Sequence, residues 1–265
     1  MKKIILYTLI SVATIVGFAQ NKRGDIIKSG KQYFIYLSEF RTPEANEEFQ
    51  RNLSIIQAQN AQLKQIKDRI ASSQKEEEKL YLQATMKKLE SEYKANEKIM
   101  GQAYGFASNR TYKQIYFKSN LCVILTKEEI AQLKMNNKPL DPQKMANKGN
   151  YSMYRIKEID GPIENEQLQI KLTDLMNKQL EINRYRKQLS ETKDAVAQKS
   201  INAKIVEAET QIKNIDKQLR TTYAIPEGRD YAVEVANSRL YMLLTPQEVK
   251  QIEEQIAKNN KKAKK

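Results

Sequence analysis

The sequence predicts an α+β fold, mostly α, of two tandem modules, each a small three-stranded body with a long antiparallel coiled-coil hairpin. Three observations predict it: an internal repeat, a heptad-like apolar rhythm in the middle of each repeat, and short alternating apolar segments at its ends. Residues 32–133 match residues 151–252 without a gap, at a constant offset that Pro43 and Pro162 illustrate (162 − 43 = 119). The matching residues are concentrated at the two ends of each repeat, while the middle keeps only the apolar rhythm. This distribution is typical of a structural protein rather than of an enzyme.

Each repeat opens with a segment that predicts a strand. Apolar residues alternate at Tyr33, Ile35 and Leu37 in the first copy, and Tyr154 and Ile156 repeat the two later positions. Period two with aromatic and β-branched residues is typical of a half-buried strand. Proline then stands where a helix can begin, because its missing N–H is not needed in the first turn.

The middle of each repeat predicts two helices joined by a short polar turn. Apolar residues recur at three- and four-residue steps through residues 44–103 and again through residues 163–222. Such a pattern in two consecutive helices is typical of an antiparallel helical hairpin. Asn60 and Gln179 occupy the same seam position, where a polar residue usually sets the register.

The end of each repeat predicts a β-hairpin followed by a capped helix. Turns are expected at Ser119-Asn120 and at Asn237-Ser238. The closing helices should begin at Thr126 and Thr245, each with a glutamate three residues later in a capping box. The strand residues expected to build the bodies and the assembly are Ile35, Leu37, Tyr112, Leu121, Leu125, Tyr231, Val233, Val235, Leu240 and Leu244.

The beginning of the chain is typical of a secretory signal peptide over residues 1–19. Lys2 and Lys3 precede an apolar stretch, and Gly17 and Ala19 stand at the −3 and −1 positions of a cleavage site. We therefore expect a soluble periplasmic protein. The remaining boundaries are a first module at 31–134 (hairpin 44–103), a linker at 135–149, a second module at 150–257 (hairpin 163–222) and a basic tail at 258–265.

Composition argues against several functional classes. The formal net charge is +14, yet residues 44–103 carry ten basic and ten acidic side chains, so the excess lies mainly outside the helical middles. This charge favours acidic partners. Nucleic acid does not fit the export signal, whereas contact of the Lys-rich tail with an anionic membrane surface stays open. The chain has no His, one Cys and few Gly, and it shows no phosphate loop, nucleophile motif or metal-ligand spacing. We expect no enzyme activity, no cofactor and no metal.

The order of elements resembles the Skp/OmpH family of periplasmic chaperones. The residues that carry the likeness are Arg229–Val235, Leu240–Met242 and Thr245–Val249, which look like the closing strands and helix of that family. The resemblance implies a trimer with a β-structured hub, whose arms surround a cavity for unfolded outer-membrane proteins. This chain departs from the family in having two modules, which do not map simply onto a three-fold hub, and in having nearly neutral arms.

The leading hypothesis is an ATP-independent holdase that binds unfolded outer-membrane or envelope proteins in a cage of helical arms, acting as a homo-oligomer. Adaptable apolar surface suits clients without a fixed shape. The expected client contacts are the apolar residues off the helical seam: Ile55, Ile66, Leu80, Tyr81, Met176, Leu180, Tyr185 and Val206. Packing between neighbouring arms or modules is the other reading of these residues. The alternative function is a periplasmic coiled-coil scaffold or spacer that binds folded partners, and an efflux-type adaptor is a weaker one.

Overall fold

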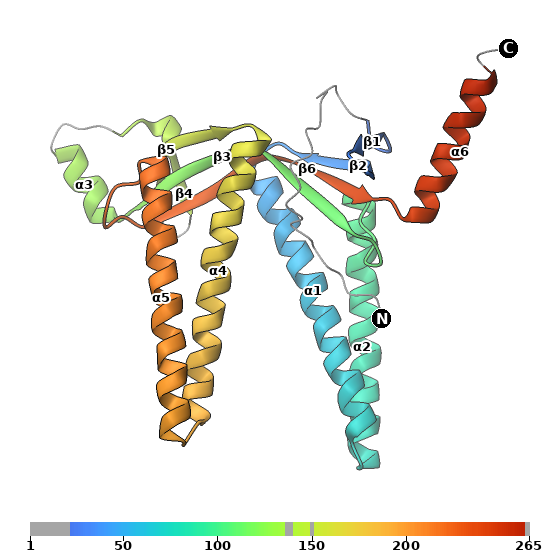
Figure 1. Ribbon diagram of the computed structural model, residues 1–265, viewed down its shortest axis with the longest axis horizontal. Coiled ribbons are helices and arrows are strands. Elements are labelled where there is room, and N and C mark those ends of the chain that lie inside the picture. The colour runs from blue at the N-terminus through green and yellow to red at the C-terminus, as the bar shows by residue number, and fades with distance from the viewer. Residues whose placement is uncertain (1–21, 136–139, 149–150, 263–265) are drawn as a thin grey trace. The chain divides into compact units, whose positions relative to one another are not determined.

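A six-stranded antiparallel sheet is the central element of the fold (Figure 1). The computed structural model describes residues 22–135, 140–148 and 151–262. The predicted signal peptide at 1–19 lies outside these residues, as do parts of the predicted linker and residues 263–265 of the predicted tail. The strand order is β1-β2-β6-β3-β5-β4, so the strands of the two repeats alternate across the sheet's centre instead of forming separate groups.

The elements follow the two repeats in chain order. The first repeat and the residues beside it contribute β1 (Ile26–Ser29), β2 (Gln32–Phe40), α1 (Pro43–Ser72), α2 (Glu76–Tyr104), β3 (Tyr112–Leu125) and α3 (Lys127–Met135). The second repeat and the residues beside it contribute the short 3-10 helix η1 (Pro142–Lys144), β4 (Met145–Lys148), β5 (Tyr151–Asp160), α4 (Pro162–Glu191), α5 (Ala195–Tyr223), β6 (Tyr231–Leu243) and α6 (Pro246–Lys262).

Local signals position the helix ends. Helices α1 and α4 begin at Pro43 and Pro162, the positions that proline favours at a helix start. Thr42 caps α1 by accepting a hydrogen bond from the Ala45 amide. Helix α2 ends at Gly105, whose φ of 73° is a left-handed conformation that costs glycine little. Helices α1 and α2 then pack along each other as one long pair, and α4 and α5 as another.

The predicted fold class is wrong in its architecture. There are no two separate three-stranded bodies among the described residues, because β3 and β6 are single long strands that run straight through the expected turns. The physical reason lies at those turns. Neither Ser119-Asn120 nor Asn237-Ser238 contains the glycine that tight hairpin turns favour. Ser119 and Ser238 are also fully buried, whereas the tip of a hairpin would be exposed.

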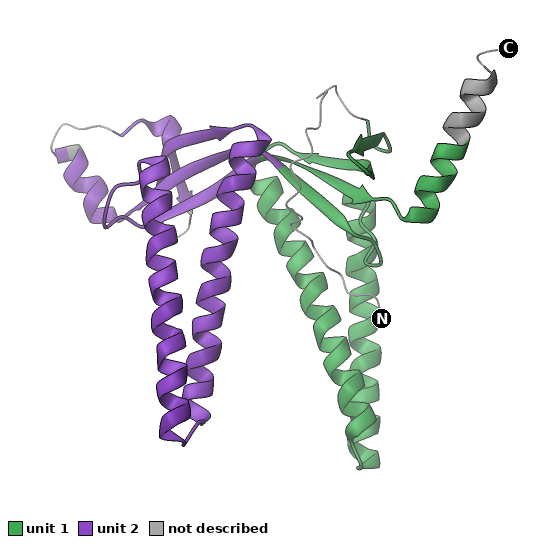
Figure 2. Ribbon diagram, viewed as in Figure 1, with its two compact units in different colours: residues 1–115, 237–265 green, residues 116–236 purple. Residues whose placement is uncertain are grey.

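The chain divides into two compact units that do not coincide with the repeats (Figure 2). Unit 1 consists of residues 1–115 and 237–265, and unit 2 of residues 116–236. Each unit therefore contains the opening strand and the helical pair of one repeat. The closing helix, and the half of the long strand that leads into it, come from the other repeat. We call residues 118–135 and 237–254, which are equivalent in the repeat, the closing segments.

The cores of the units show this exchange directly. In unit 1, Leu240 of the second repeat is buried with Leu37, Phe49 and Tyr112 of the first. In unit 2, its equivalent Leu121 of the first repeat is buried within a cluster that otherwise comes from the second. Burial of each large apolar side chain contributes roughly 1.5–3 kcal/mol. Each core is therefore completed only by the other repeat.

Candidate functional site on the arms and their roots

Two helical arms carry the residues expected to bind a client. Arm 1 is α1 and α2 with the turn at 73–75, and arm 2 is α4 and α5 with the turn at 192–194. The root of each arm is the half of its unit where the helices meet the sheet. Each root holds its arm by three kinds of contact: an apolar core, a buried asparagine and an ion pair to the closing segment.

Aromatic side chains fasten the root of arm 1. The rings of Phe40 and Phe49 stack with their centroids 4.8 Å apart, and Tyr104 meets Phe49 edge-on at 5.1 Å. These three side chains come from β2, α1 and α2, so the cluster joins both helices of the arm to the sheet. Such pairs add stability beyond the burial of their area.

A buried asparagine at the start of α1 links arm 1 to both repeats. The Nδ2 group of Asn46 donates to the carbonyls of Thr42 at 2.9 Å and Phe40 at 3.4 Å. Its Oδ1 accepts from the hydroxyl of Ser238 at 2.5 Å and from Nε2 of Gln114 at 3.3 Å. The contacts to Phe40 and Ser238 are buried and the other two are partly buried, and an unpaired polar group in such surroundings is costly.

The equivalent asparagine of arm 2 is only half satisfied. Asn165 donates to the carbonyls of Gly161 at 2.8 Å and Ile159 at 3.0 Å, as Asn46 does at its own position. Its Oδ1 and the hydroxyl of Ser119, however, are buried without a hydrogen-bond partner. Val233 stands where the first repeat has Gln114 (114 + 119 = 233), so the amide donor of unit 1 has no counterpart there.

An arginine of each repeat binds the capping glutamate of the other. Arg110 donates from both terminal nitrogens to the two carboxylate oxygens of Glu248, each at 2.8 Å. Arg229 makes the equivalent ion pair with Glu129. The hydrogen bonds from Arg110 and from the Thr245 amide lower the pKa of Glu248 to about 2. The same carboxylates close the predicted capping boxes of α3 and α6.

A second polar cluster fixes the loop that returns from arm 2 to the sheet. Arg220 pairs with Asp216 at 2.7 Å and donates to the carbonyls of Pro226 and Arg229. The Tyr231 hydroxyl donates to the other carboxylate oxygen of Asp216 at 3.0 Å. Burial and this hydrogen bond to the negative carboxylate raise the pKa of Tyr231 to about 12.

Six of the eight expected client contacts are exposed on the arms. Tyr81 is 71% exposed and Leu80 is 60% exposed near the end of arm 1. The other exposed members are Ile55, Met176, Leu180 and Val206. Ile66 is half-buried. Tyr185 packs against the Ile182 cluster inside arm 2, so its side chain contributes to the packing of that arm. Met176 and Leu180 lie four residues apart and so share one face of α4.

Further exposed apolar residues were missed by the sequence analysis. On the arms they are Ile99, Ile163 and Val196, all more than half exposed. Each stands off the helical seam, so the same off-seam criterion could have found them. Gln179, expected in the seam, is instead exposed, and its amide donates to Asn183 along α4. One polar contact between the helices of arm 1 joins Asn96 to Gln59 at 3.1 Å.

The strand residues expected to build the bodies are divided between the units by the exchange. Ile35, Leu37, Tyr112 and Leu240 belong to the core of unit 1 or pack against it. Leu121, Tyr231 and Val233 do the same in unit 2. Leu125 and Leu244 are buried, and Val235 is half-buried. The seven residues that belong to these two cores or pack against them therefore help to hold the arms.

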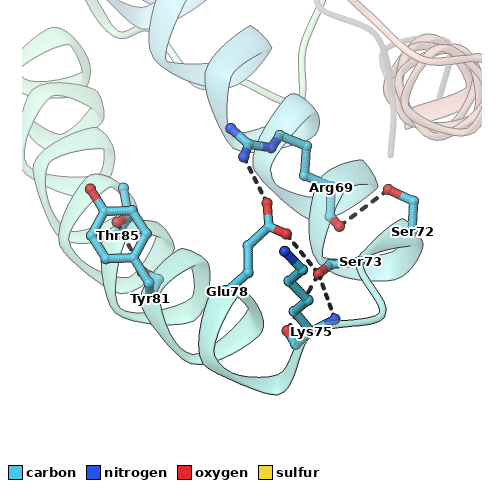
Figure 3. A network of polar contacts seen from close by, with 7 residues as sticks. All are labelled: Arg69, Ser72, Ser73, Lys75, Glu78, Tyr81 and Thr85. Carbon is cyan, nitrogen blue, oxygen red and sulfur yellow. Dashed lines mark hydrogen bonds and ion pairs between the residues drawn. The ribbon is translucent and has the colours of Figure 1, made fainter.

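The end of arm 1 carries a polar network and the exposed Tyr81 (Figure 3). Glu78 accepts from Arg69 and from the Ser73 hydroxyl, each at 2.9 Å, and these contacts lower its pKa. Ser73 also accepts from the amide of Lys75, which shapes the turn. Figure 3 shows Tyr81 beside Thr85 on α2, apart from the Arg69–Glu78 pair.

The described residues contain no group of three or more His, Cys, Asp or Glu side chains arranged to hold a metal ion. Within the same residues, no helix is both long and apolar enough to span a bilayer. No family model matches this chain, and comparison with curated proteins and with solved structures likewise finds no match.

Proposed function

We propose that this protein is an ATP-independent holdase of the periplasm, which binds unfolded outer-membrane or envelope proteins through its two arms. The exposed apolar side chains of the arms carry this proposal, with Tyr81, Leu80 and Met176 as the clearest examples. Scattered apolar groups on a charged helical surface offer adaptable contacts to an unfolded chain without matching one shape. The resemblance to the Skp/OmpH family supports the same function.

The roots support this function by holding the arms at the sheet. Aromatic packing, the Asn46 contacts and the Arg110–Glu248 pair all lie where arm 1 meets the sheet. Beyond the root, the buried residues along arm 1 thin out to single positions such as Leu63 and Leu82. Helical pairs with few buried residues open locally at low cost, which suits the capture of clients of different size.

The test is light scattering with a urea-unfolded outer-membrane β-barrel protein diluted into buffer with and without the chain. We expect suppression of scattering at near-stoichiometric amounts. A variant with Met176, Leu180 and Val206 changed to Gln should need about tenfold more chain, since roughly 0.5 kcal/mol lost per contact sums to about 1.5 kcal/mol. The control changes three exposed polar residues of the same arm conservatively: Asn177→Gln, Lys199→Arg and Asn202→Gln. No suppression by the unchanged chain, at low or high salt, would refute the holdase.

A second function, a scaffold that binds a folded partner, is favoured by one observation. The end of arm 1 combines a fixed polar network with exposed Leu80 and Tyr81, as in a preorganised protein interface. A photo-crosslinking amino acid at position 81 can be compared with one at the equivalent Ser200 of arm 2. One discrete product from position 81 alone would favour the scaffold, whereas many products from both positions would favour the holdase.

A further inference from the structure

The root of each arm accepts its closing segment from a different repeat, and both roots accept it in the same way. In unit 1, β2 pairs with β6 so that Phe40 lies opposite Ser238 and Ile35 opposite Met242. In unit 2, β5 pairs with β3 so that Ile159 lies opposite Ser119 and Tyr154 opposite Val123. These are the same positions, 119 residues apart. The two roots are therefore equivalent acceptors for equivalent closing segments.

The contacts that bind the closing segment of unit 1 are specific as well as apolar. Glu39 of β2 accepts hydrogen bonds from Arg239 at 3.2 Å and Asn237 at 3.4 Å. Farther along, Arg110 binds Glu248 through two hydrogen bonds, and the Tyr33 hydroxyl donates to Glu253 at 3.1 Å. Charged and polar groups thus select the register along the whole segment, from the end of β6 into α6.

The path that leads into the closing segment contains no turn. Strand β6 runs without interruption from Tyr231 to Leu243, and the border between the units falls within it at residues 236 and 237. A closing segment that enters along an extended strand needs no particular loop to reach its acceptor. Exchange of identical elements between copies of a chain costs little when the same contacts are formed in both arrangements.

We infer that the root of arm 1 also accepts the closing segment of a second copy of this chain, so that two chains associate by exchanging residues 237–254. The partner copy then contributes its own copies of Ser238, Leu240 and Glu248 to a root that is incomplete without them. Two chains joined in this way bring four arms into one particle. This inference is independent of the proposed holdase activity, because its test measures mass and not aggregation.

The experiment uses charge reversal to favour exchange of residues 237–254 between two chains over binding of these residues within one chain. In Arg110→Glu chains, the introduced carboxylate at position 110 faces Glu248. In Glu248→Arg chains, Arg110 faces the introduced guanidinium at position 248, so each variant alone closes against like charges. If the two variants are unfolded and refolded together, exchange of residues 237–254 restores an opposite-charge pair at the root of arm 1 in each of the two chains. We expect native mass spectrometry to show a dimer with one copy of each, about tenfold more abundant than any dimer from either variant alone.

Two controls keep the result decisive. A single chain with both substitutions restores the pair internally and should give no more dimer than the unsubstituted chain, and its stability measures the cost of losing the Glu248 cap at Thr245. Unsubstituted chains with two different mass tags, refolded together at high concentration, should form mixed dimers. Mixtures that contain only monomers, both for the complementary variants and for the tagged chains, would overturn the inference.

Discussion

Substitution of the two equivalent asparagines tests whether the roots are as unequal as their hydrogen bonds indicate. Asn46→Ala removes four hydrogen bonds and leaves the carbonyl of Phe40 and the hydroxyl of Ser238 with fewer partners. Asn165→Ala removes only two, and it also removes an oxygen that is buried without a partner. The same chemical change should therefore cost unit 1 more than unit 2.

The magnitudes follow from the hydrogen bonds. At about 1 kcal/mol each, Asn46→Ala should lower the free energy of unfolding of unit 1 by about 4 kcal/mol. Asn165→Ala should lower that of unit 2 by about 2 kcal/mol, and removal of the unpaired oxygen should return about 1 kcal/mol of this. The expected difference between the two variants is thus about 3 kcal/mol.

The assay is urea denaturation followed by circular dichroism, combined with amide hydrogen exchange that reports α1 and α4 separately. Hydrogen exchange is needed because two units do not guarantee a single two-state transition. Faster exchange should appear mainly in α1 for Asn46→Ala and only weakly in α4 for Asn165→Ala. Equal losses of stability in the two variants would refute the reasoning, since both asparagines would then depend only on the two carbonyl contacts that they share.

Three further outcomes are expected. Val233→Gln should stabilise unit 2 by about 1 kcal/mol by giving Asn165 and Ser119 an amide partner, whereas Val233→Leu should not; urea midpoints compare them. The carboxyl of Glu248 has a pKa lowered in the folded state, so its contribution to the stability of the fold is present above about pH 4.5 and is lost as the pH falls toward 2. Acid titration of the unchanged chain should therefore show a larger loss of stability than acid titration of Glu248→Gln. The pKa of Tyr231 is raised to about 12, so the stability it contributes is present below pH 10 and is lost between about pH 10 and 12; Tyr231→Phe should weaken this alkaline loss.

Local features of the fold were predictable because they depend on neighbouring residues. Proline at the helix starts and threonine with glutamate at the closing helices act over three or four positions, and the structure has helices at those places. The exposed positions of Leu80 and Met176 also follow from their place off the helical seam. For these residues, composition and spacing carry the needed information.

The exchange between the repeats was not predictable, because equivalent residues make equivalent contacts in both arrangements. Arg110 can meet Glu129 of its own repeat in a closed module or Glu248 of the other repeat in the exchanged one, and the side-chain chemistry is identical. Only the link between strand halves decides, and Ser119-Asn120 resembles a turn as readily as it continues a strand. The burial of Ser119, which excludes the turn, is visible only in the structure.

The division of unit 1 between both ends of the chain has a consequence for folding during synthesis. Unit 2 is one continuous stretch, residues 116–236, and all of its core residues are available as soon as that stretch has emerged. Unit 1 has its helical arm early but receives Leu240 and Glu248 only after residue 237 has followed. The root of arm 1 therefore stays incomplete until residues 237–254 have been synthesised, whereas unit 2 can be complete before that point.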